Sequence, residues 1–185
     1  MMQIERMRPE DFDAVFRLLS QSFPAGERRD AAGQRALLSD SAYRIDILRA
    51  PSGGVQALMA SWDFDDFVFF EHFAVDPACR SGGIGGQMLD ALLACAHKPA
   101  CLEAELPETE LPETELAARR IGFYERHGFT VNADYPYFQP ALVPGGSPLP
   151  MHLLTTGGAR TAAELRAIET LLHTRVYGKT PAAMI

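Results

Sequence analysis

Apolar residues recur along the chain with two different spacings, which predict helices and strands in alternation. Near the N-terminus the spacing is helical, and a proline followed by two acids opens the predicted helix over residues 9–22. Three strand-like runs rich in aromatic and β-branched residues follow at 43–48, 55–62 and 67–75, each ended by a short turn. Strands joined so closely are typical of an antiparallel meander.

The remaining pattern adds elements on both sides of this meander. Before it, we expect a short strand over 3–7 and a helix over 27–38. After it, we expect helices over 84–97, 115–127 and 161–177 and strands over 100–106, 129–132 and 151–155. This order predicts a three-layer α+β fold, with a mixed, mostly antiparallel sheet flanked by helices, rather than a doubly wound parallel sheet.

The same pattern predicts one globular domain over 1–156, followed by a C-terminal helical extension over 157–185. No linker inside the first segment is long enough to divide it. The last helix carries an apolar stripe that needs burial, either against the core or against a partner subunit. A homodimer is therefore one of the expected arrangements.

Composition and charge narrow the class of protein. Of the 185 residues 47% are hydrophobic and 22% are charged, which excludes intrinsic disorder. The chain has no uncharged apolar run of about 18 residues and no apolar signal region at its charged start, so we expect a cytoplasmic protein without a membrane partner. The net charge of −7 argues against a nucleic-acid partner. Three cysteines predict reduced, mostly buried thiols.

A glycine-rich turn joins the third strand of the meander to the following helix. Its sequence is Arg80-Ser81-Gly82-Gly83-Ile84-Gly85-Gly86. The glycines let a ligand approach the backbone closely, and the N–H groups of a helix start beside an arginine suit a phosphate or pyrophosphate. The dinucleotide-binding fingerprint lacks its third glycine here, and the Gly-Lys-Ser/Thr of a Walker A loop does not occur. A tight turn without a ligand is the alternative.

Two stretches of the sequence resemble motifs of one enzyme family. Arg80, Gly83 and Gly85 satisfy the pattern R/Q-x-x-G-x-G/A, which resembles the acyl-CoA pyrophosphate loop of the GNAT superfamily of N-acetyltransferases. The second stretch resembles the family's A-x-x-F-Y-x-x-x-G-F signature and reads Ala117-Ala118-Arg119-Arg120-Ile121-Gly122-Phe123-Tyr124-Glu125-Arg126-His127-Gly128-Phe129. With the order of elements, the resemblance covers about residues 3–155 and looks like a bacterial subgroup whose acceptor is unknown.

The resemblance implies how acetyl-CoA would be held as co-substrate. The strand before the glycine turn would splay from its neighbour, and its backbone would pair with the pantetheine arm through Phe73, Ala74 and Val75. The Val75 amide would donate to the thioester oxygen. The pyrophosphate would be held by Arg80 and by the backbone amides of Ser81, Gly82, Gly83, Ile84, Gly85 and Gly86.

Glu71 is the expected base for the acceptor amine. Strict alternation along its strand places Glu71 on one face with Phe69, Phe73 and Val75, and burial beside phenylalanines would raise its pKa. Glu71 would accept the proton directly or through water, or hold the ammonium. The alternative is a structural carboxylate paired with an arginine. His72, expected on the opposite face, is the weaker candidate.

Tyr124 resembles the GNAT tyrosine that protonates the departing CoA thiolate. The alternative is a helix-end aromatic side chain that packs on the core.

We therefore expect an acyltransferase that moves an acetyl group from acetyl-CoA to a primary amine by direct attack in a ternary complex. No metal is expected, because Cys95, His97 and Cys101 lack a fourth ligand at zinc spacing. The rival function is a non-catalytic acyl-CoA-binding or regulatory module on the same fold.

The acidity of the chain is concentrated in one segment, residues 103–115, which contains a direct repeat of Leu-Pro-Glu-Thr-Glu. The simplest explanation of the repeat is a local duplication that lengthened a loop. Outside the segment the chain has 18 acids against 17 bases, so it is nearly neutral. Beside an acceptor entrance, six carboxylates would favour a cationic amine, either a small molecule or a peptide: Glu103, Glu105, Glu108, Glu110, Glu113 and Glu115.

Overall fold

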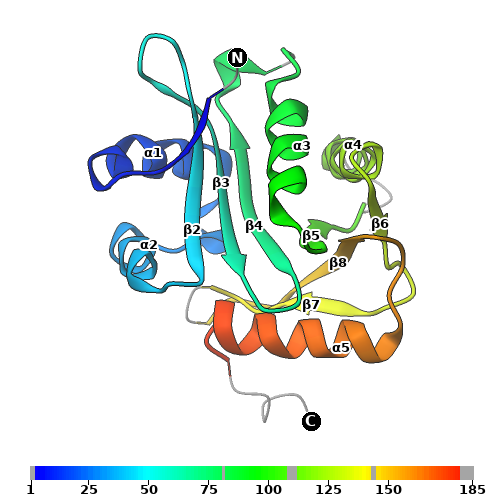
Figure 1. Cartoon of the computed structure of the whole chain (residues 1–185). Coiled ribbons are helices and arrows are strands. Elements are labelled where there is room, and N and C mark those ends of the chain that lie inside the picture. The colour runs from blue at the N-terminus through cyan, green and yellow to red at the C-terminus, as the bar shows by residue number, and fades with distance from the viewer. Residues whose placement is uncertain (1–2, 81, 108–111, 143–144, 180–185) are drawn as a thin grey trace. The chain divides into compact units, whose positions relative to one another are not determined.

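The chain folds into two compact units, residues 1–100 and 101–185. The computed structural model describes residues 3–80, 82–107, 112–142 and 145–179, with 112–115 described by their backbone alone. Each unit contains its own antiparallel strands and its own helices (Figure 1).

The first unit is built on four antiparallel strands in the order β1-β2-β3-β4. Their bounds are β1 Ile4–Arg6, β2 Tyr43–Arg49, β3 Val55–Asp63 and β4 Val68–Val75. Aromatic and β-branched residues, which suit a pleated and buried surface, make up much of these strands. The three strands predicted for the meander are confirmed to within one residue at each end.

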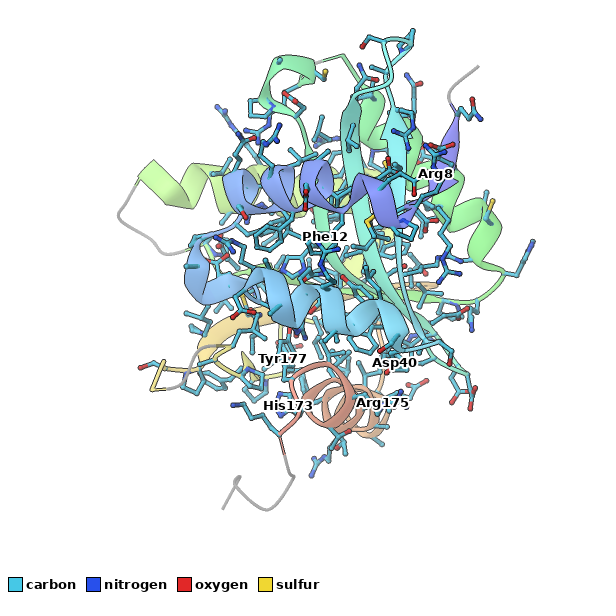
Figure 2. The ribbon with its side chains drawn as sticks, turned by 90° about the vertical axis from the view of Figure 1, so that its left-hand side faces the viewer. Arg8, Phe12, Asp40, His173, Arg175 and Tyr177 are labelled. Carbon is cyan, nitrogen blue, oxygen red and sulfur yellow. The ribbon has the colours of Figure 1, made fainter. Side chains whose placement is uncertain are left out.

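Helices of the first unit lie on both faces of these strands. They are α1 Phe12–Ser22, α2 Ala31–Ala36 and α3 Ile84–Ala96, with short 3-10 turns at Pro9–Asp11, Ala25–Glu27, Leu37–Ser39 and Pro77–Cys79. Figures 1 and 2 show α1 and α2 on one side of β2–β4 and α3 on the other. Helix α2 begins later than predicted, because the Asp30 side chain accepts from Gly33 N at 2.7 Å and so caps the helix there.

A β-bulge interrupts the pairing of β4 with β3. Ala60 lies opposite His72 and the next residue, Ser61, lies opposite Phe70, so Glu71 has no opposite residue on β3. Such an extra residue bends its strand and reverses the alternation of side chains beyond it. The bulge therefore decides which side chains share a face of the sheet.

The prediction that Glu71 shares a face with Phe73 and Val75 is wrong, because it assumed unbroken alternation. Glu71 points to the α1–α2 face, where it bonds the indole of Trp62. Val75 points to the α3 face, where its side chain lies close to Gly85 at the start of that helix. His72 lies opposite Ala60, which shares a face of β3 with Trp62, so His72 lies on the same face as Glu71. Phe73 lies two residues from Val75 on the regular part of β4 and shares its face.

The second unit is organised around one long strand, β8 (Leu149–Thr156). On one edge β8 pairs with β5 (Ala100–Glu105), and on the other it pairs with β7 (Tyr137–Gln139) and then β6 (Phe129–Val131). Each of these pairs is antiparallel. The helices of this unit are α4 (Pro112–Arg126) and α5 (Ala162–Leu171).

The C-terminal helix packs within its own unit. It begins as the sequence predicts, with a capping box in which Thr161 and Glu164 bond each other's backbone N–H groups. It continues beyond α5 as a π-helical turn, Leu172–Val176. There His173 Nε2 lies 3.1 Å from the carbonyl oxygen of Phe138 on β7. After the π-turn, Tyr177 donates its hydroxyl to Glu103 on β5 at 2.5 Å.

Two predictions about local structure are corrected. Residues 137–139 form strand β7, although the sequence predicts no strand there. Their partners on β8 lie ten to fourteen residues further along the chain, and no local pattern indicates the pairing. The thiols are free, but only Cys101 is buried, while Cys79 is half-buried and Cys95 is exposed. Cys79 ends a 3-10 turn and Cys95 lies in the last turn of α3, and side chains at such ends are more exposed than composition alone predicts.

Candidate active site

The glycine turn brings the first turn of α3 close to the end of β4. Gly83 lies just before α3 at φ +72°, in the left-handed region that other residues rarely adopt. A Cβ on Gly85 would lie 3.2 Å from Val75 Cγ2 and 3.7 Å from Phe73 Cζ. A side chain at position 85 would therefore crowd Val75 at the end of β4, so glycine permits the close approach.

The N-terminus of α3 is the feature that the sequence predicts as an anion site. None of the described side chains caps the helix, and the amides at the start of an α-helix, here those of Ile84, Gly85 and Gly86, have no partner within the helix itself. Gly82 and Gly83 are exposed. Arg80 sits at the edge of the turn, where its Nε donates to the Val75 carbonyl oxygen at 3.2 Å. Ser81, also predicted to bind the pyrophosphate, lies outside the described residues.

The backbone of β4 presents polar groups to the edge that faces away from β3. Asp76 N donates to Gln56 O on β3 at 2.8 Å, so the groups of Ala74, two residues earlier, also face β3. The alternate residues, Phe73 and Val75, direct their N–H and C=O groups to the other edge. Of the three residues predicted to pair with pantetheine, these two point toward the edge where an added strand would lie.

Glu71 is held in a buried ion pair on the α1–α2 face. Its side chain is 2% exposed, and its Oε1 lies 2.5 Å from Nη1 of Arg29, in the segment between α1 and α2. Its Oε2 accepts from Trp62 Nε1 at 2.9 Å. Each carboxylate oxygen therefore already accepts a hydrogen bond from the protein (Figure 2 views this face).

The direction of the Glu71 pKa differs from the sequence-based expectation. Burial by itself would raise this pKa, but the Arg29 guanidinium, His72 and the Trp62 indole together hold it below its ordinary value. Glu71 is therefore ionised at neutral pH, as the alternative of a carboxylate paired with an arginine requires. The sequence offered no signal for these partners, because Arg29 lies 42 residues away.

His72 lies beside Glu71 and is almost completely buried. The ring is 4% exposed, and Phe23, at the end of α1, packs against it edge to face at 4.6 Å between centroids. Its Nε2 lies 3.0 Å from the carbonyl oxygen of Glu27. Its Nδ1 makes no hydrogen bond with any residue that the structure describes. The bulge places this ring and the Glu71 carboxylate on one face.

Tyr124 lies in the last turn of α4 and belongs to the second unit. Its ring packs against Phe123 and Phe129. Burial raises the pKa of its hydroxyl to about 12, against a smaller opposing effect of Arg120. Tyr124 is therefore fully protonated at neutral pH, as a proton donor must be, and it also has the packing that the alternative interpretation predicts.

Neither a cluster of metal-ligating side chains nor a membrane-spanning helix occurs in the part of the chain that the structure describes. Within residues 3–80, 82–107, 112–142 and 145–179, no three His, Cys, Asp or Glu side chains come together as metal ligands. Over the same residues no helix is both long enough and apolar enough to cross a bilayer.

The acidic segment that the sequence places beside an acceptor entrance is only partly described. Glu108 and Glu110 lie outside the described residues, and the side chains of Glu113 and Glu115 do too.

Comparison with known proteins identifies similar sequences and folds. A sequence model described as an acetyltransferase (GNAT) domain matches residues 46–131. A solved structure, described as an acetyltransferase of the GNAT family from Bacteroides thetaiotaomicron, shares 33% sequence identity and has a TM-score of 0.84. That match covers 96% of this chain and 99% of the other. The fold class predicted from the sequence is thereby confirmed.

More distant structures share the fold alone. The ribosomal-protein-S18-alanine N-acetyltransferase of Escherichia coli has a TM-score of 0.62 at 18% identity, over 87% of this chain and 96% of that one. A spermidine N-acetyltransferase variant from Vibrio cholerae has a TM-score of 0.63 at 10% identity, over 83% of this chain and 94% of that one. No protein of curated function matches the sequence.

Proposed function

Because the chain belongs to the GNAT family of acetyltransferases, we propose that it transfers an acetyl group from acetyl-CoA to a primary amine. The observation that carries the proposal is the junction of β4 and α3. There Gly85 lets an uncapped helix start lie against the strand edge to which Phe73 and Val75 direct their backbone groups. One end of that junction suits a pyrophosphate, and the other suits an extended amide-containing arm.

The proposed roles along this junction follow from the charges that acetyl-CoA carries. The amides of Gly82 to Gly86, together with Arg80, bind the pyrophosphate at the positive end of the α3 dipole. The pantetheine amides pair with Phe73 and Val75 as an added strand would. The Val75 amide donates to the thioester oxygen, where negative charge develops during attack.

The proposed reaction is direct attack in a ternary complex. The acceptor ammonium first loses a proton, because only the neutral amine has a lone pair. Its nitrogen then bonds to the thioester carbon and the carbon–sulfur bond breaks, so that the products are the N-acetylated amine, CoA thiol and one released proton. Glu71 contributes a fixed negative charge near the amine, and Tyr124 donates a proton to the departing thiolate. The Tyr124 role rests on the resemblance of residues 117–129 to the family signature.

The acceptor class is a small-molecule or peptide amine. The two distant structures are acetyltransferases of ribosomal protein S18 alanine and of spermidine, so this fold serves very different amines. The acidic segment over 103–115 favours a cationic acceptor in this chain.

The test is release of CoA thiol from acetyl-CoA in the presence of a panel of amines. The panel includes spermidine, a peptide with an N-terminal alanine, free amino acids and an aminoglycoside. We expect thiol release that depends on one class of amine and is absent without it. If no amine supports release while CoA still raises the melting temperature, the non-catalytic acyl-CoA-binding module is the correct function.

A further inference from the structure

The hydrogen bond from His72 to Glu27 determines which ring nitrogen of the neutral imidazole carries the proton. A backbone carbonyl oxygen can only accept, so the Nε2 that lies 3.0 Å from Glu27 O carries the hydrogen. Nδ1 of the neutral ring therefore has a free lone pair. The structure shows this atom buried and without a hydrogen-bond partner among the described residues.

A second acceptor faces this lone pair. Glu71 Oε2 lies 3.9 Å from His72 Nδ1, too far for a hydrogen bond between them, and neither atom carries a hydrogen. A single donor atom placed off the line that joins them can lie about 2.8 Å from both. The pair is thus suited to a donor with a positive charge, which an ammonium or a water that relays its proton provides.

We propose that His72 Nδ1 accepts the proton of the acceptor amine and that Glu71 stabilises the imidazolium so formed. This inference rests on the proposed N-acetyltransferase function and names the base of that reaction. It assigns proton transfer to a residue that the sequence ranks second, and leaves Glu71 as the charge that holds the proton in place.

The surroundings of the pair favour His72 over Glu71 as the base. Both Glu71 oxygens already accept hydrogen bonds, from Arg29 and Trp62, whereas His72 Nδ1 accepts none from the described residues. The other titratable group nearby is Tyr43 on β2, whose hydroxyl is held by Gln34 and whose pKa is raised by burial and then by the Glu71 charge. Tyr43 therefore stays neutral and does not compete for the proton.

The proton balance of the step is simple. The ammonium gives one proton to Nδ1, and the ring becomes an imidazolium with its Nε2–H still bonded to Glu27. The neutral amine then attacks the thioester carbon, and Tyr124 donates its hydroxyl proton to the sulfur as the carbon–sulfur bond breaks. The second nitrogen proton restores the Tyr124 hydroxyl. After release of the products the imidazolium returns its proton to solvent, which supplies the one proton that the overall reaction sets free.

Access to Nδ1 is controlled by the segment between α1 and α2. Phe23, Glu27 and Arg29 all belong to this segment, and each contacts His72 or Glu71. Residues 24–26, between Phe23 and Glu27, are exposed. The amine reaches the pair when this short segment moves aside, and burial afterwards strengthens the attraction between the ammonium and the two acceptors.

The experiment compares His72→Gln with wild type and with His97→Gln, the same replacement at the end of α3. The glutamine amide can still donate to Glu27 O but cannot accept a proton. We expect kcat to fall by about 10²-fold in His72→Gln, and the rise of kcat with pH seen in wild type to disappear. The loss should shrink toward high pH, where the free amine is already abundant. His97→Gln should keep the wild-type rate and profile.

The carboxylate is tested in parallel. In Glu71→Gln we expect the rise of kcat with pH to persist, with a lower plateau, because the imidazolium loses its neighbouring negative charge. If Glu71→Gln abolishes the rise while His72→Gln retains it, Glu71 is the base and the inference is overturned. If wild type releases no thiol with any amine, the proposed function itself fails, and the inference fails with it.

A measurement on wild type keeps the inference testable if His72→Gln does not fold. The nitrogen-15 shifts of the imidazole report which nitrogen is protonated. We expect His72 to carry its hydrogen on Nε2 above the pH at which kcat reaches its plateau, and to gain a hydrogen on Nδ1 over the range in which kcat falls. A hydrogen on Nδ1 at the plateau would overturn the assignment.

Discussion

At the scale of single residues, the Arg29–Glu71 pair is the main feature that the sequence could not reveal. The acid in an apolar strand indicated that Glu71 is buried and has a role or a partner. The identity of its partners depended on the path of the chain between α1 and α2. The predicted direction of the Glu71 pKa was wrong for the same reason. Burial alone raises this pKa, and the sequence did not show that Arg29 lies beside the carboxylate and lowers it.

Removing Arg29 should destabilise the protein strongly. Arg29→Met leaves the buried Glu71 carboxylate without its cation, and we expect a loss of about 3–5 kcal/mol in the free energy of unfolding, measured with urea. Arg120→Met removes a half-exposed pair with Glu105, whose atoms are 3.1 Å apart, and should cost less than about 1 kcal/mol. Equal losses in the two variants would contradict the burial argument.

The same pair should make stability depend on pH in the acid range. The pKa of Glu71 is lowered in the folded protein, so its contribution is complete above the ordinary glutamate pKa of about 4.3 and is lost as the pH falls through the lower folded value. In Arg29→Met/Glu71→Gln this part of the acid dependence should be absent. Unfolding midpoints between about pH 2 and 7 test the difference, and identical slopes in both proteins would contradict it.

Tyr124 can be tested by removal of one oxygen atom. Tyr124→Phe keeps the ring packing against Phe129 and removes the proposed proton donor. We expect turnover to fall by about 10²-fold under conditions in which chemistry limits the rate, with CoA binding unchanged. Since burial raises the pKa of Tyr124 to about 12, wild type should show no alkaline loss from this group below pH 10 or so. Unchanged turnover in Tyr124→Phe would leave Tyr124 as a packing residue.

At the scale of elements, the sequence predicted the helices and strands of the first unit well, because their apolar spacings are long and regular. The glycine turn was also recognisable, since its function depends on local backbone geometry that glycine alone permits at Gly83. Strand β7 and the bulge were not predictable. Strand β7 has only three residues and is defined by its pairing with β8. The bulge is a single extra residue in β4. Neither is long enough to produce a periodic signal in the sequence.

The junction of β4 and α3 should not tolerate a side chain at position 85. In Gly85→Val the added Cβ would meet Val75 Cγ2 at 3.2 Å, and the helix start would move off the strand. We expect a loss of about 1–3 kcal/mol in unfolding free energy together with weaker CoA binding, measured by calorimetry. Gly26→Ala is the control, because nothing lies within 4 Å of its added Cβ. Unimpaired CoA binding in Gly85→Val would contradict the proposed role of this close approach.

At the scale of the whole molecule, the net charge of −7 is unevenly distributed along the chain. One segment, 103–115, holds six of the 24 acids and no lysine or arginine, so the remaining chain is nearly neutral. Part of this segment is structural: Glu103 accepts the hydroxyls of Tyr137 and Tyr177, and Glu105 pairs with Arg120. Glu103 and Glu105 therefore have structural partners within their own unit.

Neutralising the repeat tests whether it selects a cationic acceptor. In Glu108→Gln/Glu110→Gln/Glu113→Gln we expect the KM for spermidine to rise several-fold at low salt and to approach the wild-type value at high salt, because salt screens charge attraction. Asp65→Asn/Asp66→Asn, at the exposed turn between β3 and β4, is the matched control and should change the KM little. An unchanged KM in the triple variant at low salt would show that the repeat is only a lengthened loop.

The bulge in β4 links the length of this strand to the charge buried beneath α1 and α2. Without the residue at position 71, His72 would still lie opposite Ala60 and Phe70 opposite Ser61, so the two strands would form an unbroken ladder. The same deletion would leave the largely buried guanidinium of Arg29 without its carboxylate. The residue that interrupts the pairing is therefore also the one that neutralises Arg29, and the strand cannot become regular without leaving a cation buried inside this unit.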